Sequence, residues 1–296
     1  MRIGMFTAAA MAPLDDLVAQ VRLARDAGLA SAFFGHLSSW DALMTAALAG
    51  REVPGIEVGT AIVPTYPRHP LTLASQALTA QAAAGGRFTL GIGPSHQAII
   101  EGSYGIPYDR PARHVREYLS ALRPLLRGED VDHHGETLTA AGTVDAPGVT
   151  PPPVILSALG PAMLRIAGEL ADGTVTTWTG ADAIADHVVP AITRAAESAG
   201  RPAPRVLAGA MVALSTDPDG VHREVAERFA AASDLPAYRA ILDRQGLSGV
   251  HETVIAGDET AVAARLRRFA DAGATDLLIS PYGDAARVLE FAASLS

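Results

Sequence analysis

Short apolar runs alternate with amphipathic helical patterns from one end of the chain to the other. The runs with strand character are residues 2–6, 31–35, 57–63, 88–93, 154–157, 173–177, 205–214 and 276–280. Sharing 296 residues among eight such units leaves 37 for each, enough for a strand, a helix and two loops. This pattern predicts an α/β fold, a closed (β/α)8 TIM barrel with parallel strands, rather than an unusually wide open sheet.

The helices between these runs are marked by their ends. Asp15 and Asp16 bring negative charge to the positive end of the first helix, which stops at Gly28. Further helices are predicted over residues 70–84, 113–126, 161–170, 182–199 and 258–273.

Two stretches, residues 129–153 and 234–251, fit no minimal βα unit. Insertions of this kind commonly build over the C-terminal mouth of a barrel, where substrates bind, and we expect both of them there. No linker is recognisable, so residues 1–296 are predicted to form a single domain.

Composition excludes several kinds of chemistry and partner. The chain has no Cys, so disulfides, thiolate chemistry and the usual zinc frameworks are excluded, and no metal site is expected. Every one of the 23 basic residues is Arg, so no lysine Schiff base can form. A net charge of −9 argues against a nucleic-acid partner.

The apolar content predicts a protein outside the membrane. No run approaches the roughly 18 uncharged residues of a membrane-spanning helix. The apolar N-terminus imitates a signal peptide, but residues 2–6 are better interpreted as a buried strand. A cytoplasmic location is therefore expected.

Two aromatic side chains follow the second predicted strand. His36 and Trp40 lie four residues apart where that strand runs into its helix. An imidazole and an indole at a barrel mouth can stack on a planar cofactor and exchange a proton with it. The alternative is purely structural, with His36 capping the strand and Trp40 packing in a loop.

The third and fourth strands end in glycine-rich and proline-rich segments. Gly59 lets a ring or another backbone approach closely, and three prolines stiffen the exit over residues 64–70. The fourth strand carries Gly91 and Gly93 and bends to present Ser95 and His96. It lacks the third glycine and the immediate helix of a dinucleotide fingerprint, so that interpretation is rejected. His96 is a candidate acid or base, or a loop hydrogen-bonding group.

Two later turns complete the set. Gly160 precedes Pro161 at the first position of a helix, where unpaired N–H groups can bind phosphate. Trp178 ends the sixth predicted strand, where it either walls a pocket or fills the top of the barrel.

Taken in this order, the segments resemble the luciferase-like monooxygenase superfamily, in its F420-dependent oxidoreductase branch of actinobacterial type. The resemblance is carried by His36 with Trp40, and by residues 59–62, 85–96, 104–111, 158–161 and 171–173. It implies a deazaflavin across the mouth, its ring near His36 and Trp40 and against Ala61 and Ile62, which it implies are joined by a cis peptide.

The resemblance also implies which residues contact the coenzyme. These are His36, Thr60, Ala61, Ile62, Gly93, Pro94, Ser95, His96, Ala158, Leu159, Gly160 and Trp178, of which Ala158, Leu159 and Gly160 offer N–H groups to its phosphate. His36, Trp40 and His96 are the candidate catalytic residues. Arg68, Arg110 and Arg113 are candidates to hold the coenzyme's anionic tail.

Two departures from the family pattern bear on the substrate. Gly35 stands where relatives often have an acid, and His96 stands where the sugar-phosphate dehydrogenases carry Glu. The implied activity is hydride transfer between F420 and an unidentified small organic substrate, and the two departures argue against a sugar phosphate. The alternatives are an FMN-dependent monooxygenase and a non-catalytic F420-binding protein, and the fold is compatible with a homodimer.

Overall fold

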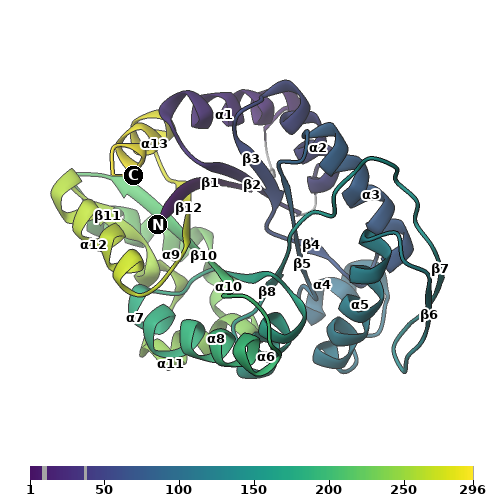
Figure 1. The fold of residues 1–296 in the computed structure, drawn as a ribbon. Coiled ribbons are helices and arrows are strands. Elements are labelled where there is room, and N and C mark those ends of the chain that lie inside the picture. Colours follow the sequence, from purple (N-terminus) through teal and green to yellow (C-terminus); the bar gives the residue numbers. More distant parts are fainter. Residues whose placement is uncertain (9–11, 37–38, 296) are drawn as a thin grey trace.

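Eight parallel strands close into a barrel with helices around it, in a computed structural model that describes residues 1–8, 12–36 and 39–295 (Figure 1). The barrel strands, in order, are β1 (Arg2–Ala8), β2 (Ser31–Gly35), β3 (Glu57–Thr60) continued by β4 (Val63–Pro64), β5 (Phe88–Gly93), β8 (Val154–Ser157), β9 (Gly173–Thr176), β10 (Arg205–Leu214) and β12 (Asp276–Pro281). Because β12 pairs with β1, the sheet has no free edge there. The predicted TIM barrel is confirmed.

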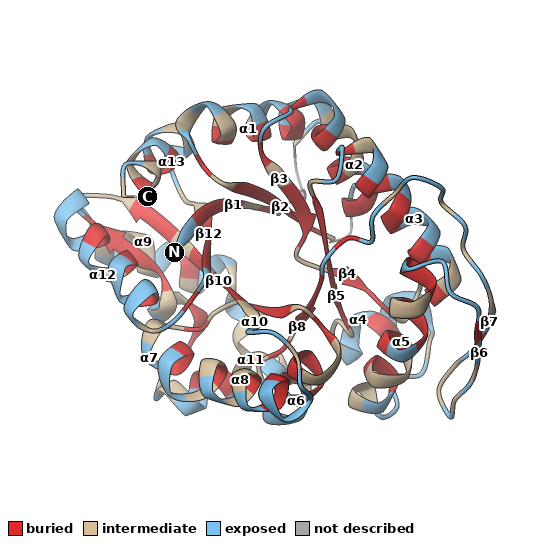
Figure 2. Cartoon of the chain, viewed as in Figure 1, coloured by how far each residue is buried: buried red, intermediate tan, exposed pale blue. Residues whose placement is uncertain are grey.

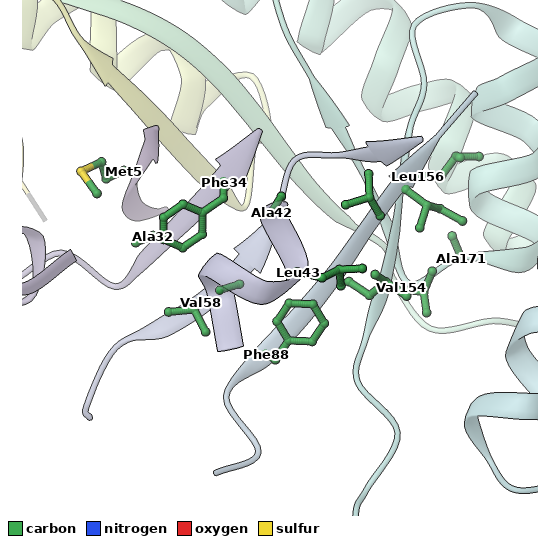
Figure 3. Packing of buried hydrophobic residues seen from close by; sticks show 14 of the residues in the cluster. Met5, Ala32, Phe34, Ala42, Leu43, Val58, Phe88, Val154, Leu156 and Ala171 are labelled. Carbon is green, nitrogen blue, oxygen red and sulfur yellow. The ribbon is translucent and has the colours of Figure 1, made fainter. Parts of the chain in front are cut away.

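Helices follow the strands as the sequence pattern indicates. They are α1 (Leu14–Ala27), α2 (Ala42–Glu52), α3 (Pro70–Ala83), α4 (Gln97–Tyr104), α5 (Pro111–Leu126), α6 (Pro161–Leu170), α7 (Ala181–Ala183), α8 (Val189–Ser198), α9 (Pro218–Arg228), α10 (Ala230–Ser233), α11 (Pro236–Gln245), α12 (Glu259–Asp271) and α13 (Ala285–Ala293). Buried side chains of helices and strands meet on the outside of the barrel wall (Figures 2 and 3).

The helix predicted over residues 182–199 is interrupted by a π-helical turn, η1 (Ile184–Val188), between α7 and α8. Pro190 has no N–H to donate to the carbonyl four residues earlier, so a regular α-helical ladder is interrupted at this point.

The third strand is broken between β3 and β4. Gly59 pairs with Thr89, and Val63 pairs with Ile92. The segment between these pairs is therefore one residue longer on the β3–β4 side than on β5, as in a β-bulge. The Ala61–Ile62 peptide within this break is cis, as predicted.

A layer of apolar side chains fills the barrel interior. Phe33, Ile155, Val175, Leu207 and Leu278 form this cluster, which we call the plug. A Cβ on Gly59 would lie 2.4 Å from the Phe33 ring, so the glycine makes room for that ring.

Charged residues close the barrel below the plug. Arg205 contacts the carboxylates of Glu57 (2.9 Å) and Asp276 (2.7 Å), and Arg2 contacts the same two acids. We call these four side chains the floor. Each is the first residue of its strand, so the floor lies at the N-terminal end of the barrel and the mouth at the opposite, C-terminal end.

The two insertions differ in where they lie. Residues 129–153 form a hairpin of β6 (Val131–His134) and β7 (Thr139–Gly142) on the outer side of α3 and α5 (Figure 1). The prediction that this segment covers the mouth is wrong. Its tip is held by Glu117 of α5, whose carboxylate accepts hydrogen bonds from the N–H groups of Glu136 and Thr137.

The second insertion contains α11, as predicted, and contacts residues of the mouth. It is followed by a 3₁₀ turn, η2 (Val250–Thr253), and by β11 (Ile255–Gly257), which pairs with the end of β10. This ninth strand in the wall was not predicted, because three residues are too few for a recognisable pattern.

Candidate active site

The mouth has an apolar base. Phe6, Ala61 and Ile62 are partly buried and pack on the plug. They cover the plug on the side of the mouth, and we call them the seat.

His36 is fixed at the edge of this seat. Its backbone N–H donates to the carbonyl of Ile62 (3.1 Å), and its Nδ1 accepts from the N–H of Ala42 (3.3 Å). Burial, together with the positive charge of Arg68, lowers the pKa of His36. The imidazole is therefore neutral at pH 7, and acceptance at Nδ1 assigns its proton to Nε2.

Asp41 and Arg68 support the same corner. Asp41 caps α2 by accepting from the N–H groups of Leu43 and Met44, and its second oxygen accepts from Arg68 at 2.5 Å. Arg68 is thus paired within the protein.

Trp40 lies at the rim. The residue is 43% exposed, and its indole N–H donates to the carbonyl of Ala12 (2.9 Å), which ties the loop after β2 to the loop after β1. Residues 37–38 of the same motif lie outside the described residues.

Gly93 brings three strands together at the mouth. A Cβ at this position would lie 3.1 Å from Ser157 and 3.2 Å from Ile62. Both distances are shorter than ordinary van der Waals contact, so the glycine lets β5 pack closely against Ile62 and Ser157. Thr60, in contrast, is fully buried, and its hydroxyl is used within the wall by Gly91.

The segment after β5 is held by aromatic residues. Ser95 has a φ of 63°, and its carbonyl accepts from the Tyr108 hydroxyl (2.9 Å). The His96 ring meets the Tyr238 ring edge-on, with 4.7 Å between centroids. Burial lowers the pKa of His96, so this imidazole is also neutral at pH 7. Pro94, which precedes Ser95 in the chain, is half-buried.

The loop before α6 is shaped as expected for an anion site. Among the residues that the structure describes, no side chain caps α6, and a Cβ at Gly160 would meet no atom within 4 Å. The carbonyl of Leu159 is hydrogen-bonded to Nε2 of His187 (2.7 Å). Ala158 is buried in the wall.

Trp178 lies against the second insertion. Its φ is 53°, and its ring centroid is 5.6 Å from that of Phe229. The amide of Gln245 donates to the Trp178 carbonyl (3.1 Å) and accepts from the N–H of Gly180 (2.7 Å).

Three residues at the mouth were not predicted from the sequence, namely Phe229, Tyr238 and Gln245. Their segments resemble nothing strongly, and the one available indication was that an insertion after a barrel strand tends to reach the mouth.

Two arginines predicted to hold an anionic tail are engaged elsewhere. Arg110 (2.5 Å) and Arg113 both pair with Glu136 at the hairpin tip. Over residues 1–8, 12–36 and 39–295, no group of three His, Asp or Glu side chains is arranged to hold a metal ion. No helix in the same residues is long and apolar enough to cross a membrane.

Comparison with known proteins identifies the family. The sequence model of the luciferase-like monooxygenases matches residues 1–276. The chain belongs to this family. Among its members, a 5,10-methylenetetrahydromethanopterin reductase of Methanolobus tindarius is 27% identical over 223 residues, covering 75% of this chain and 68% of its own. A putative coenzyme F420-dependent oxidoreductase of Mycobacterium tuberculosis is 30% identical over 167 residues, covering 52% and 48%.

Solved structures share the whole fold. The coenzyme F420-dependent tetrahydromethanopterin reductase of Methanopyrus kandleri superposes with a TM-score of 0.80 at 22% identity, covering 99% of this chain and 97% of its own. A type II Baeyer–Villiger monooxygenase of Pseudomonas putida, solved with FMN, gives 0.78 at 17% identity, covering 99% and 96%. The proteins that this chain resembles thus include some named for F420, and a protein of the same fold has been solved with FMN.

Proposed function

We propose that the chain is an oxidoreductase that transfers a hydride between coenzyme F420 and a small organic substrate at the barrel mouth. The observation that carries this proposal is the apolar seat of Ala61 and Ile62, bordered by a neutral histidine that is fixed to the seat by a backbone hydrogen bond. A flat, uncharged ring fits such a surface better than a charged metabolite does.

The residues present fit the coenzyme at one further place, the start of α6. The uncapped start of α6 at Gly160 suits a phosphate, because its N–H groups are unpaired and the helix dipole favours negative charge there. Arg68 is already paired with Asp41, so phosphate binding would rely on backbone groups.

Each histidine has a distinct role in this proposal. F420, when bound, supplies the two-electron hydride chemistry. His36 offers an Nε2–H donor that orients a ring on the seat, since its Nδ1 is already occupied. His96, neutral and placed against Tyr238, accepts or returns the proton that accompanies a change of charge at the mouth.

Relatives named for F420 support the choice of coenzyme, and relatives solved with FMN define the main alternative. The proposal also includes a cytoplasmic location and no nucleic-acid partner, the latter because the net charge is −9. A homodimer is compatible with it.

A side-by-side binding titration tests the proposal. Purified protein is titrated with F420 and with FMN, and we expect saturable binding of F420 with FMN weaker by at least about tenfold. Equal or tighter binding of FMN contradicts the F420 assignment. Bound reduced F420 that no carbonyl, alkene or imine acceptor oxidises would favour a non-catalytic binder.

A further inference from the structure

A cavity of about 460 Å³ lies beside the barrel mouth, within the ring of helices. It is lined by residues of α7, the π-helical turn η1, α11, η2 and α12, and it is open to solvent on one side. Its volume is in the range of small-ligand sites. No residue of the seat contributes to its lining, so it is a separate compartment.

Three arginines line this cavity, and their partners differ. Arg268 pairs with Asp182 at 2.6 Å. Arg244 is exposed. Arg265 is half-buried, and in the part of the chain that the structure describes its guanidinium has no hydrogen bond or ion pair.

The acids of the cavity do not compensate Arg265. Asp182 is engaged with Arg268, and one oxygen of Glu252 accepts from the backbone N–H and hydroxyl of Ser248. Asp186 is exposed. A guanidinium that is partly withdrawn from water and has no acidic partner is less stable in its charged form, and burial with the nearby charge of Arg268 accordingly lowers the pKa of Arg265.

We propose that this cavity is a second ligand site, for small oxyanions bearing carboxylate or phosphate groups, and that Arg265 is the residue that binds them. The guanidinium fork matches both groups, because each presents two oxygens to it. Arg244, at the exposed side, adds positive charge to the same compartment.

The walls of this cavity are also walls of the mouth. Gln245 lines the cavity and holds the carbonyl of Trp178, while His187, in the π-helical turn, lines it and holds the carbonyl of Leu159. An anion bound at Arg265 therefore occupies the same cavity as two side chains that are hydrogen-bonded to loops of the mouth. Trp178 consequently serves as a reporter of occupancy.

Thermal unfolding of the coenzyme-free, full-length protein tests the site with citrate and with inorganic phosphate, each compared with NaCl at equal ionic strength. We expect at least one of the two anions to raise Tm above the NaCl value, and the better anion identifies the ligand class. No rise with either anion overturns the proposal.

Two variants on α12 separate this site from any other anion site, including the start of α6. R265Q removes the guanidinium and should weaken binding at least about tenfold, since the charge-assisted hydrogen bonds to the anion are lost. R267Q makes the same change at an exposed neighbour outside the cavity and should respond as the unmodified protein does. An unchanged response in R265Q contradicts the proposal.

Two further readouts exclude a merely structural role for Arg265. Without anion, R265Q should be as stable as the unmodified protein or more so, because an uncompensated charge has been removed; a large loss of stability contradicts the proposal. If R265Q does not fold, R265K keeps the charge and must show weakened binding. In W40F protein, where Trp178 is the remaining tryptophan, the anion should change the fluorescence, and R265Q should abolish that change.

Discussion

At the scale of single residues, the mouth is defined by hydrogen bonds that leave particular atoms available. The backbone N–H and the Nδ1 of His36 are hydrogen-bonded within the protein, and its Nε2 is available to a ligand. The sequence pattern correctly placed this histidine at the end of the second strand. It did not indicate which ring nitrogen remains, because that depends on Ala42, six residues further along the chain.

Replacing His36 with Ala should weaken F420 binding by about tenfold or more, because one hydrogen bond to the ring and the edge of the seat are lost together. Fluorescence titration of the coenzyme measures the affinity. The matched control is His134→Ala, which removes an exposed imidazole on the outer hairpin and should leave the affinity unchanged. Identical affinities for the two variants would remove His36 from the site.

Replacing His96 with Ala should spare F420 binding and lower turnover by roughly 10²-fold, as for loss of a general acid or base. Burial lowers the pKa of His96, so the neutral, proton-accepting form persists down to pH values below 6.5. Turnover should therefore hold near neutrality and decline on acidification. That acidic decline should be absent from the variant; a variant that retains both full turnover and the decline would show that His96 is a loop residue only.

At the scale of elements, the strands were predictable because each is a short apolar run between clear helix signals. Residues 31–35, 88–93 and 205–214 match their strands end to end. The break between β3 and β4 was not predicted from the residues themselves, since it depends on one extra residue relative to β5.

The hairpin over residues 131–142 was misplaced for a similar reason. The sequence shows that the segment is inserted, but its position depends on Glu117 and on His69, whose ring is hydrogen-bonded to the carbonyl of Thr139 (2.7 Å). These contacts join segments far apart in the sequence, and neither segment carries a local pattern that reveals them.

Thr60 repairs the broken strand, and this gives a prediction at the element scale. Its hydroxyl accepts from the N–H of Gly91 (2.9 Å) and donates to the carbonyl of Gly91 (2.8 Å), which replaces backbone pairing across the break. Thr60→Val keeps the shape but leaves both groups of Gly91 unsatisfied in a buried place, so it should lower the free energy of unfolding by about 1–3 kcal/mol.

Urea denaturation measures this effect. Thr79→Val on α3 is the matched control, because it removes an exposed hydroxyl bonded only to the helix backbone and should change stability by less than about 0.5 kcal/mol. Equal stabilities of the two variants would show that Thr60 does not hold the strands together.

At the scale of the whole molecule, the barrel separates a charged floor from an open mouth by the plug. The sequence predicted the barrel and placed His36, Gly93 and Gly160 at or just after strand ends, and parallel strands bring those ends to one face. The position of Ala61 and Ile62 at the mouth was implied only by the family resemblance. The floor was not predicted from the sequence, because Arg205 and Glu57 are 148 residues apart and each resembles an ordinary charged residue at a strand end.

The floor makes stability depend on pH through Glu57, whose side chain is 15% exposed. Burial by itself would raise the pKa of Glu57, but the charge of Arg205 and hydrogen bonds from Arg205, Thr89 and Arg2 outweigh it and lower that pKa. A carboxyl with a lower pKa in the folded state stabilises the protein above its unfolded pKa, roughly 4.3. This stabilisation is lost as the pH falls through the folded pKa.

Glu57→Gln should therefore lower the free energy of unfolding at pH 7 by about 2 kcal/mol, because the guanidinium of Arg205 then lacks one of its two carboxylates in a half-buried place. The loss should shrink as the pH falls below the unfolded pKa of the carboxyl, because Glu57 is protonated first in the unfolded state and only at lower pH in the folded protein. Urea denaturation between pH 7 and pH 3 measures both effects. Glu259→Gln removes an exposed partner of Arg287 and should reproduce the unmodified profile. If the stabilities of Glu57→Gln and the unmodified protein differ by the same amount at every pH, the floor acts through packing and not through the charge of Glu57.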